Sequence, residues 1–356
     1  MNGENEPLPV SVITGFLGSG KTTLLSRLIR QPGMEKTAVV INEFGEVGLD
    51  HELVAASNDE NIMVMDSGCI CCSIRGELAE TLRDLFARRA REEIPAFDRV
   101  VIETTGLADP APVLHTLMAD PLVGSCFRLD SVVTTVDGVH GGGQLDRHEE
   151  SLKQAAMADR LLLTKTDLAG DKDLEALEGR LSGINPSAPR YRAVHGEIDP
   201  DRLFGAGLYD PETKSADVRN WLREQAFEAH DHHGHDHEHH DHDHHHGHRH
   251  DERFTSFCLR RDEECTWNTW VGFLEALITS HGASLLRLKG ILNVTGLETP
   301  VAVHGVQHMF HPPAILEAWP SDDRTSRLVF IGDGLSQAGV EKMLDAWIEA
   351  ERGANP

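Results

Sequence analysis

Short apolar runs alternate with longer amphipathic stretches through the first two thirds of the chain. Such alternation is typical of βαβ units, in which helices connect the neighbouring strands of a mainly parallel sheet. The runs around VVI and LLL are continuously apolar, as strands buried on both faces should be. The expected strands are residues 10–14, 37–42, 62–66, 100–103, 131–137 and 161–164, and the expected helices include 21–30 and 74–91.

A different pattern follows a low-complexity segment, residues 230–252, in which no aliphatic residue could enter a core. Beyond it we expect strands at 254–260, 285–292, 300–306 and 327–331, and helices at 267–281 and 337–350. The chain should therefore comprise an α/β domain at 1–229, a His-rich disordered linker at 230–252 and a smaller α+β domain at 253–356.

Histidine and charge are distributed differently along the chain. Of the 22 histidines, 13 lie between His230 and His250, whereas the net charge of −25 is spread over both expected domains. The acidity argues against nucleic acid or an anionic membrane as a partner. The start of the chain lacks the basic and apolar segments of a signal peptide, and no apolar run reaches 18 residues, so we expect a cytoplasmic protein.

A phosphate-binding loop is indicated by GFLGSGKT, between an apolar strand and a helical stretch. Its glycines would let backbone N–H groups and the helix N-terminus face phosphate oxygens. Lys21 would reach the outer phosphates, and the Thr22 hydroxyl would ligate Mg²⁺. The predicted loop residues are Gly15, Gly18, Ser19, Gly20, Lys21 and Thr22.

The segment RVVIETTG places an acid and a glycine after another buried strand. In nucleoside triphosphatases a carboxylate here holds Mg²⁺ through water, and the glycine senses the γ-phosphate. We assign these catalytic roles to Glu103 and Gly106, together with Lys21. An acid that merely ends a strand in solvent is the alternative.

The segment RLLLTKTD follows a third apolar strand. The Asp167 carboxylate can accept two hydrogen bonds from guanine that adenine cannot offer, while the Lys165 stem lies along the base. These residues favour GTP over ATP. Thr164 stands where such elements usually begin with Asn, so one supporting hydrogen bond is expected to be missing.

Three cysteines are grouped as Cys69, Cys71 and Cys72, whereas the other three are scattered, which is not a disulfide framework. Three convergent thiolates with an open fourth position suit Zn²⁺ or another thiophilic divalent ion. Glu46 or Glu43 could fill the fourth position. Packing and redox roles are the alternatives.

The segments GFLGSGKTT, INEFGEVGLD, DSGCICC, ETTGLADP and LLTKTD occur in this order, followed by LLRLKGIL, HGVQ and SRLVFIGDGL. Together they resemble the CobW-type metallochaperone GTPases, and NEFGEVGLDHEL is more similar to the general zinc-handling branch than to the cobalamin-pathway branch. The resemblance covers nearly the whole chain except the His tract.

The resemblance implies a P-loop GTPase domain with a CobW-like C-terminal domain, slow GTP hydrolysis, and delivery of a metal to a client protein. By motif it assigns phosphates and Mg²⁺ to Gly18, Gly20, Lys21, Thr22 and Thr23, and it places His195 in a guanine-contacting loop. Cys69, Cys71 and Cys72 would hold the ion.

We therefore expect a GTPase that carries Zn(II) to a client metalloprotein, without nucleic acid or membrane partners, and with a homodimer dependent on nucleotide or metal. A cobalt chaperone of cobalamin biosynthesis is one alternative, because three thiolates also hold Co²⁺ adequately. A metal storage protein dominated by the His tract is the other. As an accessory to the thiolate site, the His tract would bind several ions weakly. The alternative interpretation of the tract is a solvated linker without a metal role.

Overall fold

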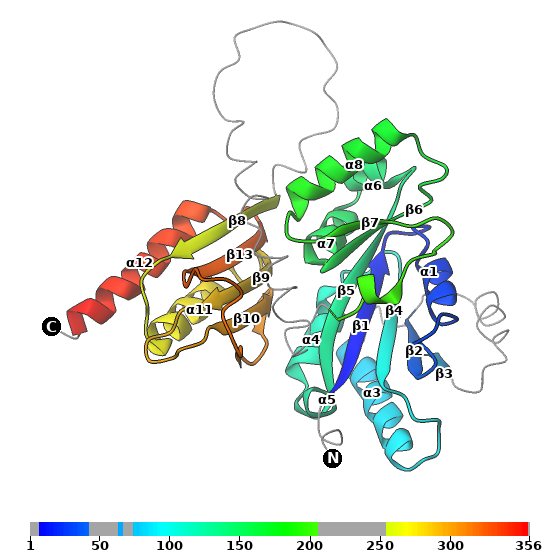
Figure 1. Cartoon of the computed structure of the whole chain (residues 1–356), viewed down its shortest axis with the longest axis horizontal. Helices are drawn as coiled ribbons and strands as arrows, with labels where there is room; N and C mark the ends of the chain where they lie inside the picture. The colour runs from blue at the N-terminus through cyan, green and yellow to red at the C-terminus, as the bar shows by residue number, and fades with distance from the viewer. Residues whose placement is uncertain (1–6, 43–62, 67–73, 206–253, 355–356) are drawn as a thin grey trace, which may run out of the picture. The chain divides into compact units, whose positions relative to one another are not determined.

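The computed structural model describes residues 7–42, 63–66, 74–205 and 254–354 (Figure 1). The chain divides into two compact units, Met1–Glu178 with Pro189–Gly207 and Gly179–Ala188 with Leu208–Pro356. The domain limits expected near residues 229 and 253, and the His-rich linker between them, lie outside the described residues and stay predictions.

The first unit contains a seven-stranded sheet in the order β3-β2-β4-β1-β5-β6-β7, in which every pairing is parallel. This confirms the predicted α/β class with a mainly parallel sheet. The strands are β1 (Leu8–Gly15), β2 (Thr37–Asn42), β3 (Met63–Asp66), β4 (Arg99–Thr104), β5 (Phe127–Asp137), β6 (Arg160–Thr164) and β7 (Arg190–Arg192).

Helices lie alongside the strands of this sheet (Figure 1), and the first of them packs through its apolar side. In the first helix, Leu24, Leu25 and Leu28 are buried at helical spacing against strand residues such as Ile13 and Val101. The helices are α1 (Lys21–Leu28), α3 (Ile74–Ala90), α4 (Ala111–Ala119), α5 (Pro121–Cys126), α6 (Gly141–Arg147) and α7 (Glu149–Met157), with a 3₁₀ turn, η1 (Pro200–Arg202). Helix α8 (Asp171–Ile184) begins in this unit, and its residues from Gly179 onward belong to the second unit.

The strand register brings the carboxyl ends of the central strands to one edge. Gly15 at the end of β1 pairs with Thr135 of β5, and Asp137 at the end of β5 pairs with Thr164 of β6. On the other side of β1, Ile13 pairs with Glu103. Ligands of open parallel sheets bind at this edge, so the register fixes where the site must be.

The second unit is built on an antiparallel sheet in the order β11-β10-β9-β13-β8, with β12 also paired to β10. Alternate strand residues such as Leu288 and Phe330 join a core with Trp270 and Leu344 of the two helices. This confirms the smaller α+β domain. Its elements are β8 (Phe254–Arg261), α11 (Trp267–His281), β9 (Leu285–Leu292), β10 (Val301–Val306), β11 (Met309–Phe310), β12 (Ala314–Ile315), β13 (Ser326–Asp333) and α12 (Gln337–Ala354).

Among the helices described in both units, none combines the length and the apolar character that crossing a membrane requires.

Candidate nucleotide-binding site

The predicted phosphate loop joins β1 to α1 and lies tightly against β5. Gly15 has φ 143°, and a Cβ built on it would lie 2.3 Å from Thr135 Oγ1 and 2.4 Å from the Thr135 carbonyl oxygen. A side chain at this position would therefore push the loop off the neighbouring strand. Glycine is required because the backbone itself makes the contact.

Lys21 and the start of α1 give the loop its positive character. Lys21 Nζ donates hydrogen bonds to the carbonyls of Gly15 at 2.9 Å and Phe16 at 3.2 Å, which holds the ammonium over the loop. Gly20, in a left-handed conformation, is the N-cap of α1. Because it has no side chain to accept hydrogen bonds, the first N–H groups of the helix carry no side-chain cap. Helix N-termini of this kind bind phosphate.

Hydroxyl groups fasten the loop to the strands beside it. Ser19 Oγ lies 2.6 Å from Thr135 Oγ1, and Thr164 Oγ1 donates to the Ser19 carbonyl at 2.7 Å. Thr164, which stands where such elements usually have Asn, therefore makes a direct hydrogen bond to the phosphate loop. A hydroxyl has one proton, and its other neighbour, the Val136 carbonyl, is more distant at 3.3 Å.

Thr22 and Glu103, the residues expected at Mg²⁺, are in direct contact. Thr22 Oγ1 donates to Glu103 Oε1 at 2.7 Å, although 81 residues separate them. Glu103 is 3% exposed and Thr22 is half-buried, whereas the neighbouring Thr23 is exposed. A hydroxyl and a buried carboxylate that meet beside a phosphate loop form an oxygen ligand set that suits Mg²⁺.

Gly106 lies in a turn that touches the phosphate loop. The Ala108 N–H donates to the Thr105 carbonyl at 3.1 Å, which closes the turn around Gly106 and Leu107. A Cβ on Gly106 would lie 2.7 Å from both the backbone nitrogen and Cα of Leu17. The predicted γ-phosphate sensor is thus in backbone contact with the loop that would hold the phosphates.

The guanine-reading element follows β6. Lys165 has φ 53°, and its Nζ forms a salt bridge with Asp137 Oδ2 at 2.7 Å. The other oxygen of Asp137 accepts hydrogen bonds from the N–H groups of Val139 and His140. Burial raises the pKa of Asp137, but the Lys165 hydrogen bond, the two backbone N–H groups and the Lys165 charge together hold that pKa below its ordinary value. The carboxylate is therefore a fixed anion beneath Lys165.

The loop after β7 completes this part of the site. His195 has φ 54°, and its Nε2 lies 3.9 Å from Asp167 Oδ2. The next residue, Gly196, is packed so closely that a Cβ on it would lie 3.1 Å from the Thr23 carbonyl oxygen of α1. The structure thus brings His195, Asp167 and Lys165 to the same edge as the phosphate loop, and their contacts with a guanine base stay predictions.

Three residues at this edge were not singled out from the sequence. Asp137 is an acid at the end of a buried strand, and Glu103 was selected from the sequence on that ground, so the same reasoning could have identified Asp137. Gln154 of α7 contacts the Gly106 turn, and His148 at the start of α7 stacks on Phe16 of the phosphate loop with ring centroids 4.4 Å apart. These two carried no signal, because they lie within an ordinary amphipathic helix pattern.

The predicted metal ligands Cys69, Cys71, Cys72 and Glu46 lie outside the described residues. The three-thiolate site therefore stays a prediction. The described part of the chain holds no other group of three or more His, Cys, Asp or Glu side chains suited to a metal ion.

Comparison with known proteins supports a nucleotide-binding site at this edge of the sheet. Residues 9–192 match the family described as CobW/HypB/UreG, nucleotide-binding domain. The chain belongs to this family. Residues 254–348 match the cobalamin synthesis protein CobW C-terminal domain, which confirms the CobW-type resemblance for both units.

Members of the family resemble the chain over nearly its full length. The zinc chaperone YjiA of Escherichia coli is 33% identical over 334 residues, covering 94% of this chain and 96% of YjiA. The zinc chaperone CobW of Pseudomonas aeruginosa is 32% identical over 369 residues, covering 95% of this chain and 90% of that protein. The crystal structure of Zn(II)-bound YjiA GTPase superposes with a TM-score of 0.69 at 28% identity and covers 96% of this chain and 99% of YjiA.

Proposed function

We propose that this protein is a GTP-hydrolysing metallochaperone that binds Zn(II) at Cys69, Cys71 and Cys72 and transfers it to a client metalloprotein. The contact between Thr22 and Glu103 carries the hydrolytic part of the proposal, because a 2.7 Å hydrogen bond joins the phosphate loop to a buried carboxylate where Mg²⁺ is expected. Similarity to the zinc chaperones YjiA and CobW supports the chaperone part.

The residues of the site have separate tasks in GTP hydrolysis. Lys21 binds the outer phosphates, Gly106 faces the γ-phosphate, and Thr22 with Glu103 would hold Mg²⁺. When bound, the ion would neutralise charge that develops on the phosphate oxygens. Asp167 accepts the guanine N–H groups, and Lys165, held by Asp137, lies along the base.

Zn(II) is the cargo, and the three thiolates with Glu46 are its ligands. Because these residues lie in sequence between the phosphate loop and Glu103, nucleotide binding and metal affinity should be coupled. Similarity to YjiA and CobW, which are named zinc chaperones, favours Zn(II) over Co(II) as the cargo. The His tract would capture ions for the thiolate site, and a homodimer formed on nucleotide or metal binding would be consistent with the transfer step.

Two measurements test this function. In the first, the full chain hydrolyses GTP faster than ATP in the presence of Mg²⁺, and Glu103→Gln lowers the rate while GDP binding without Mg²⁺ is retained. Equal hydrolysis of both nucleotides, or an unaffected rate in Glu103→Gln, would contradict the GTPase assignment.

In the second, Zn²⁺ is titrated against a chelator with a variant that lacks residues 231–251. One tightly bound ion should remain, Cys71→Ser should release it, and Cys126→Ser, which changes a scattered half-buried cysteine, should not. Zn²⁺ affinity should also differ between the GDP complex and a complex with a non-hydrolysable GTP analogue. Loss of all tight Zn²⁺ on deletion of the tract would instead indicate a storage protein.

A further inference from the structure

The Gly106 turn has few ways to move independently of its surroundings. Gly106 is buried, while Leu107 at the tip is 55% exposed. On one side the turn touches the backbone of Leu17, as the clash of a Cβ on Gly106 shows. Its orientation also depends on a second contact, made by a side chain that binds the carbonyls of the turn.

Gln154 makes that contact from α7. Its Nε2 donates to the Ala108 carbonyl at 2.9 Å and to the Gly106 carbonyl at 3.3 Å, so one amide group binds both carbonyls of the turn. Only the NH₂ end of the amide can donate to two carbonyl oxygens, which fixes the orientation of the side chain. Gln154 is 1% exposed, and buried hydrogen bonds of this kind are costly to lose.

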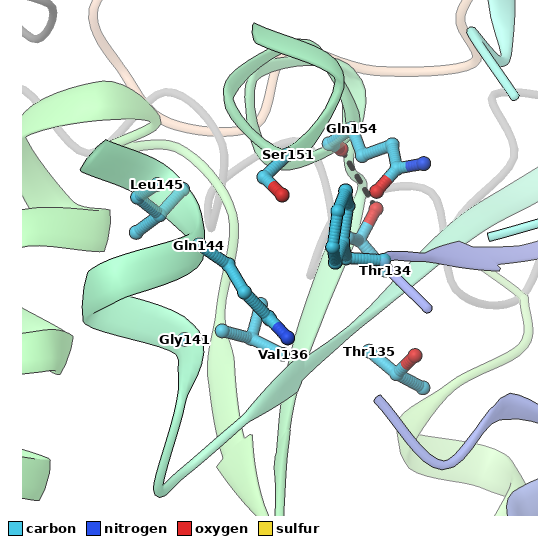
Figure 2. Close-up of a pocket in the computed structure, with 9 residues that line it drawn as sticks. Thr134, Thr135, Val136, Gly141, Gln144, Leu145, Ser151 and Gln154 are labelled. Carbon is cyan, nitrogen blue, oxygen red and sulfur yellow. Dashed lines mark hydrogen bonds between the residues drawn. The ribbon is translucent and has the colours of Figure 1, made fainter. Parts of the chain in front are cut away.

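The backbone beneath Gln154 is anchored as well. Thr134 Oγ1, from β5, donates to the Gln154 carbonyl at 2.8 Å (Figure 2). One and a half turns earlier, His148 stacks on Phe16 of the phosphate loop with an angle of 28° between the rings. Helix α7 therefore contacts both the phosphate loop and the turn, and is itself tied to the central sheet.

A small pocket is lined by residues of both contacts, Phe16 and Gln154. Figure 2 shows Gln144 of α6 together with Ser151 and Gln154 of α7 around it, and Phe16 also lines it. Gln154 Oε1 and Ser151 Oγ are buried and have no hydrogen-bond partner among the described residues. Among the described residues, the Gln154 side chain thus forms hydrogen bonds only through its NH₂ group, and both of these bonds go to the turn.

We propose that Gln154 is a positioning residue that holds the Gly106 turn in the orientation in which Gly106 meets the γ-phosphate. The inference rests on the proposed GTPase function and names the residue through which the γ-phosphate is distinguished. Gln154 does not touch the nucleotide; it acts through the two carbonyls that it binds.

The test uses Gln154→Glu in the full chain, because a carboxylate there would repel the two carbonyl oxygens and a protonated carboxyl group could donate to only one of them. The control is Gln144→Glu, which makes the same chemical change at a half-buried position of the same pocket, where the described residues show no hydrogen bond from the side chain to the turn. Affinities for GDP and for a non-hydrolysable GTP analogue are measured with Mg²⁺ by fluorescent-nucleotide binding, and GTP hydrolysis is followed by phosphate release.

In Gln154→Glu we expect the preference for the analogue over GDP to fall about tenfold and kcat to fall by a similar factor, with GDP affinity nearly unchanged. Gln154→Leu, which removes the donor without adding charge, should also lower the preference for the analogue and kcat. Gln144→Glu should match the wild type in both quantities. A general loss of folding would weaken both nucleotides together and would not change their ratio.

An unchanged ratio in both Gln154 variants would overturn the inference, as would a wild-type protein that binds GDP and the analogue equally. Failure of the proposed function has a different signature. A wild-type protein that discriminates the analogue but does not hydrolyse GTP would refute the GTPase assignment, and the ratio in Gln154→Glu would still decide the role of Gln154.

Discussion

Lys165 and Asp137 form a salt bridge of 2.7 Å in which the carboxylate is buried and the ammonium is partly exposed, with side-chain exposures of 2% and 38%. Asp137 ends β5, Lys165 directly follows the neighbouring strand β6, and the two residues lie 28 positions apart. Because Asp137 is also fixed by two backbone N–H groups, it determines where the Lys165 side chain lies. The expected guanine reader therefore depends on a residue outside its own sequence element.

Replacing Asp137 with Asn should weaken guanine nucleotide binding. Asn can still accept the backbone hydrogen bonds, but its NH₂ group would face the Lys165 ammonium in place of a carboxylate. Loss of a charged hydrogen bond should raise the Kd for GDP about tenfold, measured by fluorescent-nucleotide titration. Asp98→Asn is the control, because its salt bridge with Lys36 is largely exposed. Equal GDP affinity in both variants would show that Lys165 does not need Asp137.

Thr164→Val should loosen the phosphate loop with little change in volume. The hydroxyl bond to the Ser19 carbonyl would be lost and a buried acceptor left without this donor, which costs about 1–3 kcal/mol. We expect a lower midpoint of urea unfolding and weaker GDP binding. Thr279→Val removes a comparable hydroxyl from an exposed site on α11 and should change neither quantity. A Thr164→Val protein with wild-type stability would mean that the loop is held by its other contacts.

Much of the fold could be predicted because its strands are buried. Continuous apolar runs mark β4 and β6, shorter apolar groups mark β1 and β5, and every strand expected in the second unit was found within a few residues. The short strands β7, β11 and β12 were not predicted, and in β7 the three residues Arg190 to Arg192 carry no apolar run. As an edge strand paired on one side only, it does not need the burial that makes the central strands visible in the sequence.

The candidate site likewise contains residues that could be predicted from the sequence and others that could not. Glu103 and Lys165 could be assigned because each follows an apolar strand at a fixed position, and parallel strands bring such positions to one edge. Gln154 reaches the Gly106 turn across 48 residues and from the middle of a helix. No spacing rule connects a helix side chain to a turn carbonyl, so that contact had to come from the three-dimensional structure.

His304 on β10 should make stability depend on pH near neutrality. Burial, followed by the charges of Arg287, His311 and Lys289, lowers the pKa of His304 well below 6.5. The folded state keeps the imidazole neutral, whereas the unfolded chain takes up a proton below about pH 6.5. The free energy of unfolding should therefore fall as pH drops from 7 to 5, with a slope from this group approaching about 1.4 kcal/mol per pH unit.

The check is urea unfolding of the wild type and His304→Gln at several pH values. The variant should lose less stability between pH 7 and 5 than the wild type does, and His308→Gln, a change at an exposed position, should retain the wild-type slope. Parallel curves for the wild type and His304→Gln would contradict a buried neutral imidazole.

Gly106→Ala should impair GTP hydrolysis more than it impairs folding. The added Cβ would lie 2.7 Å from the Leu17 backbone, so either the turn or the phosphate loop must shift. Because a displacement of the γ-phosphate contacts reduces transition-state stabilisation, we expect kcat to fall by about two orders of magnitude. Gly124→Ala on α5 is the matched control, since a Cβ there meets no atom within 4 Å and Ala favours a helix. Phosphate release gives kcat, and thermal unfolding shows whether the variant is folded. A folded Gly106→Ala protein with wild-type kcat would exclude the turn from hydrolysis and would leave the loop and Glu103 to act without it.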